Sequence, residues 1–340
     1  MRYPTVNELP EPPAGKQGFP WTEETPQSLD RETEGYNWPR ISIITPSYNQ
    51  GQYIEETIRS VLLQGYPNLE YIIIDGGSTD NSVEIITKYE KWLTYWESKP
   101  DSGQSHAINK GLLKATGEWI NWLNSDDFLL PDALSQLATH IAEFPGYTNA
   151  VIFACQIVSE DGKSIKEVWH PRKPKNITSF FKRTDHPIIP QPSTFIRMDK
   201  MKILEEYHCI MDWILYLQIE DQFAGSFREI DITIAAFRDH NSSKTSTLSQ
   251  KFTDEAIFFL RNNQFQTKNI NRLVLQTIQR VEVSQAIGKI LSENNRKSLS
   301  QLIKLLLNSP NLIINRMFIG AIKKLLWQSI RYSKRSELNR

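Results

Sequence analysis

Residues 41–49 read ISIITPSYN, and this stretch decides the class of fold that we predict. Ile41 to Thr45 form a short, largely β-branched run, which is typical of a buried β-strand. Small polar residues and one tyrosine follow, and apolar residues then recur at helical spacing from Ile54 to Leu62. The stretch is therefore predicted to open a strand-turn-helix unit of an α/β domain.

The same alternation repeats along the next sixty residues. Leu69 to Ile74 form a second apolar run, followed by a helical pattern through Tyr89. Further strands are predicted at residues 95–97 and 118–123, with a helix at 104–115 between them. Such alternation predicts a mainly parallel sheet flanked by helices, a Rossmann-like α/β fold. Ligands of these sheets bind beyond the carboxyl ends of the strands, so the polar residues that follow each strand are the candidate site residues.

Composition excludes several classes of protein. The 340 residues are 39% hydrophobic, which excludes a disordered chain. The 39 Lys and Arg balance 39 Asp and Glu, so we expect no nucleic-acid partner. Only Cys155 and Cys209 are present, which favours a reducing compartment over a disulfide scaffold. The chain starts without an apolar leader and has no apolar run of about 18 residues, so we expect it to be cytoplasmic.

Three regions differ in their sequence texture. Residues 1–39 carry seven of the 18 prolines and are predicted to form an extended arm. Residues 40–245 hold the α/β domain, and residues 246–340 are predicted to be a helical, basic C-terminal extension. Residues 291–340 contain ten Lys or Arg against two Glu, a balance of +8. A helix at about 311–332 would either dock on the domain or lie at the inner face of a membrane.

The loop after the first strand suits a nucleobase. Pro46 has no N–H to donate, so we expect the strand to stop there. Thr45, Tyr48 and Asn49 then offer small polar groups and one aromatic ring. An ordinary strand-to-helix turn is the alternative.

The second strand ends in Asp75, followed by Gly76 and Gly77. A carboxylate at this position can accept a hydrogen bond from a base or ribose, and the glycines leave room for a ring. A helix cap built from the Ser-Thr-Asp run at 78–80 is the alternative, and both can hold on different residues.

The fourth strand runs into Asn124-Ser125-Asp126-Asp127. Two adjacent carboxylates at the mouth of a buried strand repel each other unless a cation neutralises them. Hard oxygen ligands suit Mg²⁺ or Mn²⁺, which would take further oxygens from a diphosphate. A solvated cap of the next helix is the alternative.

Taken in order, these segments resemble the family 2 glycosyltransferases, which have the GT-A nucleotide-sugar-binding fold. The resemblance covers about residues 40–245 and rests on five motifs: Thr45-Pro46-Ser47-Tyr48-Asn49, Asp75-Gly76-Gly77-Ser78-Thr79-Asp80, Asn109-Lys110-Gly111, Ala115-Thr116-Gly117-Glu118 and Ser125-Asp126-Asp127. It implies that Asp75 recognises the base, Asp126 lies near the ribose and Asp127 holds the metal on the diphosphate. It also implies a nucleotide-binding role for Lys110. Family members commonly show Asp-Asp-Gly-Ser where this chain has Asp75-Gly76-Gly77-Ser78, so only the first acidic position is retained.

Later residues extend the resemblance. Asp212, in Ile210-Met211-Asp212-Trp213, matches the position of the family's general base, although Met211 replaces the commoner Glu. Gln191-Pro192-Ser193 would line the acceptor pocket, or else begin an edge strand. His240 resembles a late histidine that closes over the metal or diphosphate. Arg238 and Lys244 could bind phosphate oxygens, although an ordinary charged surface is the default for both.

We therefore predict a metal-dependent, inverting glycosyltransferase using Mn²⁺ or Mg²⁺. Its donor would be a nucleoside diphosphate sugar, UDP-linked or similar, and its acceptor a saccharide or lipid-linked saccharide in polysaccharide or glycolipid biosynthesis. A non-catalytic sugar-nucleotide-binding scaffold is the alternative. A sugar-phosphate nucleotidyltransferase is disfavoured because residues 46–50 lack a Gly-rich, Lys-bearing phosphate loop.

Overall fold

A computed structural model describes residues 3–25, 38–143, 148–173 and 189–263, together with residues 265, 274 and 278. The density of contacts divides the chain into two compact units, Met1–Ala256 and Ile257–Arg340. The basic tail at residues 291–340, with its predicted helix, lies outside the described residues. The domain boundaries drawn from the sequence stay predictions.

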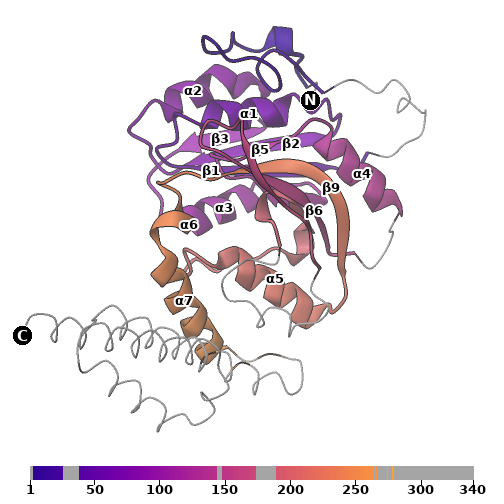
Figure 1. Ribbon diagram of the computed structural model, residues 1–340, viewed down its shortest axis with the longest axis vertical. Coiled ribbons are helices and arrows are strands. Elements are labelled where there is room, and N and C mark those ends of the chain that lie inside the picture. Colours follow the sequence, from indigo (N-terminus) through magenta and orange to yellow (C-terminus); the bar gives the residue numbers. More distant parts are fainter. Residues whose placement is uncertain are drawn as a thin grey trace, which may run out of the picture. The chain divides into compact units, whose positions relative to one another are not determined.

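The first half of the domain is a run of four parallel strands with helices between them (Figure 1). In chain order these are β1 (Ile41–Ser47), α1 (Ile54–Leu62), β2 (Leu69–Asp75), α2 (Ser82–Tyr89), β3 (Tyr95–Ser98), α3 (Gln104–Leu112) and β4 (Trp119–Trp122). The strands lie in the order β3-β2-β1-β4, and each pair in this half is parallel. Figure 1 shows α1 and α2 on one face of the sheet and α3 on the other. The predicted α/β alternation is confirmed.

The second half extends the same sheet with mixed strand directions. Its elements are β5 (Phe128–Leu129), α4 (Ala133–Glu143), β6 (Ala150–Val158), β7 (Ile165–Trp169), β8 (Thr194–Arg197), α5 (Met211–Gln222), β9 (Phe227–Arg238), α6 (Lys244–Thr247) and α7 (Ser249–Asn262). The sheet continues β4-β8-β6-β9-β5, with β7 paired to β6. β8 is antiparallel to both of its neighbours, whereas β6 and β9 are parallel. The result is the mixed, mainly parallel sheet of the prediction.

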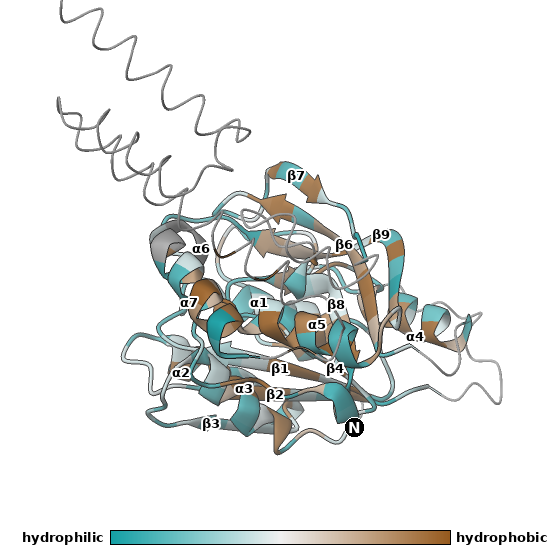
Figure 2. Cartoon of the chain, turned by 90° about the horizontal axis from the view of Figure 1, so that it is seen from below, coloured by the Kyte–Doolittle hydropathy of each residue, from teal (hydrophilic) through white to brown (hydrophobic). Residues whose placement is uncertain are grey.

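The core lies between the sheet and its helices. Ile43, Ile73 and Phe153 come from the strands, while Ile58 and Leu137 come from α1 and α4, and each is buried completely. Figure 2 shows β6 as apolar along most of its length. No helix among the described residues is long and apolar enough to span a membrane.

The strand β1 runs through Pro46, contrary to the expectation that it stops there. Pro46 and Ser47 pair with Ile74 and Asp75 of β2. On the other side, the pairing of β1 with β4 ends at Ile44. Beyond Ile44 the strand is therefore locally an edge, where a missing backbone N–H costs no ladder hydrogen bond.

The proline-rich N-terminal segment packs on the domain through a buried arginine. The guanidinium of Arg59, in α1, donates to the carbonyl oxygens of Pro10 (2.8 Å), Pro20 (2.9 Å) and Trp21 (2.7 Å). It also donates to the hydroxyl of Tyr89 at 3.1 Å. Arg59 is completely buried, so these acceptors supply the hydrogen bonds that water cannot.

Candidate active site at the carboxyl edge of the sheet

The loops after β1 and β2 are joined by side-chain hydrogen bonds. Asn49 adopts a left-handed backbone conformation with φ of 52°. Its Oδ1 accepts the N–H of Thr79 at 2.8 Å, and its own N–H donates to Oγ of Ser78 at 2.7 Å. Asp80 accepts the N–H of Gly51 at 2.9 Å, which adds a further tie. The two loops therefore form one continuous rim at the carboxyl edge.

The predicted residues of the first loop have different surroundings. Tyr48 is 61% exposed, so its ring is available to a ligand. Thr45 is buried and lies 3.1 Å from the hydroxyl of Tyr71, within the domain. Ser47 is also buried, and its hydroxyl has no hydrogen-bond partner among the described residues. Of these, Tyr48 and Asn49 lie on the rim.

The carboxylate of Asp75 is fully engaged within the protein. Its Oδ2 accepts the N–H groups of Gly77 (3.0 Å) and Ser78 (2.8 Å) and the hydroxyl of Ser98 (2.7 Å). Its Oδ1 accepts the hydroxyl of Ser78 at 2.5 Å. Asp75 is completely buried. This carboxylate therefore holds the turn after β2 against β3.

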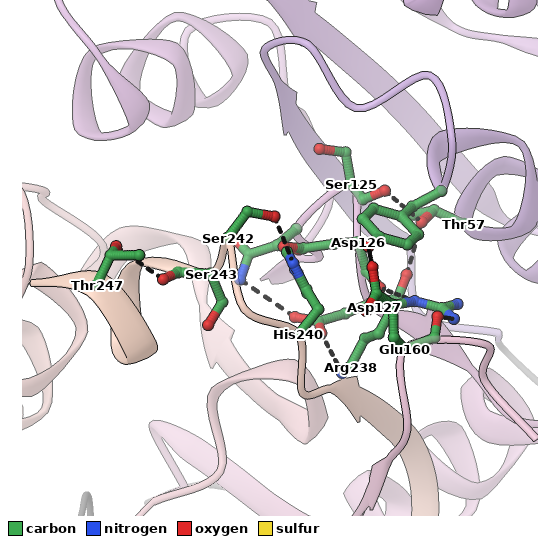
Figure 3. A network of polar contacts seen from close by, with 12 residues as sticks. Thr57, Ser125, Asp126, Asp127, Glu160, Arg238, His240, Ser242, Ser243 and Thr247 are labelled. Atoms are coloured by element: carbon green, nitrogen blue, oxygen red, sulfur yellow. Dashed lines mark hydrogen bonds and ion pairs between the residues drawn. The ribbon is translucent and has the colours of Figure 1, made fainter. Parts of the chain in front are cut away.

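The two adjacent aspartates after β4 point to different partners (Figure 3). Oδ2 of Asp126 lies 3.0 Å from Nε2 of His240, whose Nδ1 lies 2.8 Å from the hydroxyl of Ser242. Asp127 accepts the backbone N–H of Arg238 at 3.0 Å and the amide of Asn124 at 3.2 Å. Burial, reinforced by the charge of Asp126, raises the pKa of Asp127 well above its ordinary value. The side chain of Asp126 is 20% exposed, whereas Asp127 as a whole residue is 1% exposed. Of the two carboxylates, only that of Asp126 is accessible.

Arg238 is a buried support of this loop. Its guanidinium donates to Glu56 and to the carbonyl oxygens of Asp126 and Glu160, at 3.0, 2.9 and 2.7 Å. It also lies 5.0 Å from the ring centroid of Tyr53. The Arg238 side chain is 2% exposed, so the expectation that it could bind phosphate on the surface is wrong. Because Arg238 is buried and each of its three side-chain nitrogens donates within the protein, this guanidinium is not available to a ligand.

A chain of amides links the aspartate loop to α3 and to Lys244. Gln104, the first residue of α3, donates to Oδ1 of Asn124 at 2.6 Å and accepts from Nζ of Lys244 at 2.7 Å. Lys244 donates as well to the carbonyl oxygen of His208 at 3.2 Å. Asn124 donates to Oε1 of Gln191 at 3.2 Å. The segments around residues 104, 124, 191, 208 and 244 are thereby joined at one place.

Asp212 lies in the first turn of α5, shortly after His208, whose carbonyl oxygen accepts from Lys244. The segment before α5 is fastened to α3, because Ser105 donates to the carbonyl oxygen of Tyr207 at 2.7 Å. Oδ1 of Asp212 accepts the N–H of Trp213 at 2.8 Å. Burial raises the pKa of Asp212 to about 6, opposed by that backbone bond and by the charge of Lys244. A carboxylate with this pKa is suited to general-base work near neutral pH.

The remaining predicted residues fall into two groups. Lys110 lies in the last turn of α3 and pairs with Glu97 of β3 at 2.5 Å, away from the aspartate loop. This pairing lowers the pKa of Glu97 to about 2. Gln191, Pro192 and Ser193 form a buried 3-10 helix, and Ser193 donates inward to the carbonyl oxygen of Phe153. β8 begins after them at Thr194 and is a central strand, so the edge-strand alternative is wrong.

Sequence reasoning missed Gln104, Asn124 and the supporting role of Arg238. The order of residues carries a weak signal for Asn124, which stands beside the acidic pair. The sequence gives none for Gln104, whose partners are 20 and 140 residues away. The described residues contain no cluster of three or more His, Cys, Asp or Glu side chains that could hold a metal alone.

Comparison with known proteins gives a family match over part of the chain. Residues 42–207 match the family described as glycosyl transferase family 2. TuaG of Bacillus subtilis, whose name assigns it to teichuronic acid biosynthesis, is 36% identical over 154 residues, covering 42% of this chain and 56% of TuaG. An uncharacterized glycosyltransferase of Haemophilus influenzae is 44% identical over 103 residues, covering 29% of this chain and 41% of that protein. The matched region thus spans about half the length of these relatives.

A solved structure shares the fold. The crystal structure of S. aureus TarS residues 1–349 in complex with UDP-GlcNAc superposes with a TM-score of 0.52 at 18% identity, covering 72% of this chain and 71% of that one. The same TarS fragment without that ligand gives 0.52 and covers 83% of this chain. Residues 42–207 of this chain therefore match glycosyl transferase family 2, and its fold is similar to that of TarS.

Proposed function

We propose that this protein is a metal-dependent, inverting glycosyltransferase that moves a sugar from a nucleoside diphosphate to an acceptor hydroxyl. The observation that carries the proposal is the pairing of Asp126 with His240 at 3.0 Å, beyond the carboxyl end of β4. In open α/β sheets this edge is where nucleotides bind. Asp212 lies in the first turn of α5, where it can serve as the base.

Asp126 and His240 fit a divalent cation, in place of the Asp127 assignment. Oδ2 of Asp126 and Nε2 of His240 lie 3.0 Å apart, so both would contact one cation, and a carboxylate with an imidazole suits Mn²⁺ better than Mg²⁺, which prefers oxygen ligands. Two protein ligands suffice when a diphosphate and water supply the others. A cation bound there would offset the charge that grows on the departing diphosphate. Asp127 would orient the loop through its bond to the N–H of Arg238.

The nucleoside would lie along the rim formed by the loops after β1 and β2, next to the loop after β3. The exposed ring of Tyr48 can stack on a base, and Asn49 keeps the rim in place by its bonds to Ser78 and Thr79. The ribose and diphosphate would then run toward Asp126. This orientation follows the strand order β3-β2-β1-β4, which puts β4 at the diphosphate end.

Asp212 would accept the proton of the acceptor hydroxyl as that oxygen attacks the anomeric carbon. In one in-line displacement the bond to the diphosphate oxygen breaks as the new glycosidic bond forms, so the configuration at the anomeric carbon inverts. Lys244, between Gln104 and His208, places a positive charge near this base. The assignment of TuaG by its name supports a saccharide or lipid-linked saccharide as the acceptor.

The test is a screen of nucleoside diphosphate sugars, with and without Mn²⁺ or Mg²⁺, for release of the free diphosphate. Slow donor hydrolysis that requires the metal is expected from the wild type. Asp126→Asn should abolish it, whereas Lys88→Ala, in an exposed helix pair, should not. A protein that binds the nucleotide sugar and never releases diphosphate would be a binding scaffold and would contradict the proposal.

A further inference from the structure

Asp101 occupies the space that a side chain at position 76 would fill. A Cβ atom on Gly76 would lie 3.0 Å from Oδ2 and 3.1 Å from Oδ1 of Asp101. These separations are tighter than most real Cβ contacts, so a side chain at position 76 would push the carboxylate away by a few tenths of an ångström. The turn after β2 has a glycine at this position, and the space beside it holds a carboxylate from the loop after β3.

One oxygen of Asp101 is used and the other is free. Oδ1 accepts the N–H of Gly103 at 2.8 Å, which fixes the carboxylate at the start of α3. Oδ2 has no hydrogen-bond partner within the part of the chain that the structure describes, and the residue is half-buried. An ionised carboxylate is an acceptor only, so this oxygen is complementary to an N–H or O–H donor.

The carboxylate of Asp75 cannot accept a hydrogen bond from a ligand without losing a bond that holds the turn after β2. Asp75 accepts four hydrogen bonds from Gly77, Ser78 and Ser98, and it is completely buried. A ligand donor would have to displace one of these bonds. Because Asp101 lies against Gly76, the residue after Asp75, it offers an acceptor at nearly the same place without that loss.

The position of Asp101 corresponds to the nucleoside end of the site. It follows the edge strand β3, which is separated from β4 by β2 and β1. At about 4.8 Å between strands, the loop after β3 lies roughly 14 Å from β4, the strand that precedes Asp126. A group so far from the diphosphate end of an extended nucleotide meets the base rather than the phosphates.

We propose that Asp101 is the residue that reads the nucleobase, by accepting the ring N–H of a keto base such as uracil or guanine on its free Oδ2. The inference rests on the proposed function. It predicts discrimination against cytosine and adenine, whose corresponding ring nitrogens are acceptors and would face a carboxylate oxygen. It also assigns Asp75 to the turn rather than to the base.

The test is calorimetry of the full chain in the presence of Mn²⁺. The ligands are UDP, GDP, CDP and ADP, and inorganic pyrophosphate serves as a ligand that lacks a base. Asp101→Asn keeps an oxygen for the N–H of Gly103 but puts an amide donor where Oδ2 was. Loss of a charge-assisted hydrogen bond should weaken the keto-base nucleotide roughly 10–100-fold. Pyrophosphate binding should not change.

Two further comparisons isolate the contact. Gly76→Ala should weaken the same nucleotide, because the new methyl displaces Asp101 without altering it. Methylation of the ring nitrogen, as in 3-methyl-UDP or 1-methyl-GDP, should weaken binding to the wild type but have little effect on Asp101→Asn. Asp161→Asn is the matched control, since Asp161 also accepts the N–H of the residue two positions later, in an exposed turn.

The outcomes separate this inference from the proposed function. Equal affinity of Asp101→Asn and wild type for the keto-base nucleotide, with the methyl effect retained, overturns the inference and leaves the proposed function standing. An equal loss of pyrophosphate binding also overturns it, because Asp101 would then only shape the loop. If none of the four nucleotides binds the wild type, the proposed function fails and the inference fails with it.

Discussion

Asp126 and Asp127 are adjacent in the sequence, yet their carboxylates have different partners and exposure. Asp126→Asn should therefore remove the dependence of nucleotide binding on Mn²⁺, since it replaces a charged ligand by a neutral one. Asp127→Asn keeps an oxygen for the N–H of Arg238 and should lose metal affinity by no more than the roughly 10–100-fold typical of residues that orient a ligand. Calorimetric titration of Mn²⁺ with saturating nucleotide compares the two. The reverse order of effects would return the metal to Asp127.

The pKa of Asp212 predicts the pH dependence of transfer. A general base must be ionised, and burial raises the pKa of this carboxyl from 3.8 to about 6. The value of kcat/KM should therefore be constant above about pH 6 and fall tenfold for each pH unit below it. Lys244→Met should move the inflection to higher pH, because the positive charge that lowers this pKa is lost.

Substitution of the base tests the same residue at a fixed pH. Asp212→Asn should slow transfer roughly 10²–10⁴-fold, with donor affinity unchanged. Single-turnover rates and nucleotide titration separate the two effects. If the only change is weaker donor binding, Asp212 belongs to the donor site instead.

Residue types and their order were enough to find the acidic positions after the strands, but not to assign their roles. Which of two adjacent aspartates keeps an accessible carboxylate depends on the N–H of Arg238, 111 residues further along the chain, which binds Asp127. Arg238 itself was expected on the surface because a charged surface is the default for an arginine. Its partner Glu56 belongs to a helix 182 residues away, and such a pairing leaves no local trace.

At the scale of elements, the sequence predicted those strands whose residues form a local apolar run. β1, β2 and β4 are short apolar runs bounded by turn residues, and they are buried as expected. The continuation of β1 through Pro46 was missed because it depends on β4 ending its pairing at Ile44. Whether a proline is tolerated is decided by the neighbouring strand and not by the proline.

Arg59 binds the N-terminal segment to α1, so we expect its replacement to lower the stability of the domain. Arg59→Met leaves three carbonyl oxygens and the Tyr89 hydroxyl without their buried donor. Unsatisfied buried acceptors should cost about 3 kcal/mol of unfolding free energy, which lowers the Tm by roughly 6–12 °C for a domain of this size. Calorimetry should show Lys88→Ala, in an exposed i,i+4 pair, within about 0.5 kcal/mol of wild type. A similarly small effect of Arg59→Met would mean that the segment is not held by Arg59.

At the scale of the whole molecule, the parallel half of the sheet could be predicted and the mixed half could not. Successive strand-helix units place β1, β2 and β3 side by side by a general rule of α/β folds. The pairing of β6 with β9 joins segments about 80 residues apart, with α5 and β8 between them in sequence. Periodicity within one segment does not specify its distant partner, so the second half required the structure.

The charge distribution of the chain carries the last prediction, which concerns its location. Residues 291–340 hold ten Lys or Arg against two Glu in a protein whose total formal charge is zero, and apolar residues recur among them at helical spacing. If this tail contacts anionic lipid, the full chain should co-sediment with phosphatidylserine vesicles at low salt and be partly released at high salt. Each basic residue near the surface contributes about 1 kcal/mol, so the double variant Lys323→Ala/Lys324→Ala should bind roughly 30-fold more weakly. Lys88→Ala/Lys91→Ala is the matched control outside the tail. Sedimentation that is absent, or that is insensitive to salt and to the double variant, would favour the alternative in which the predicted tail helix docks on protein.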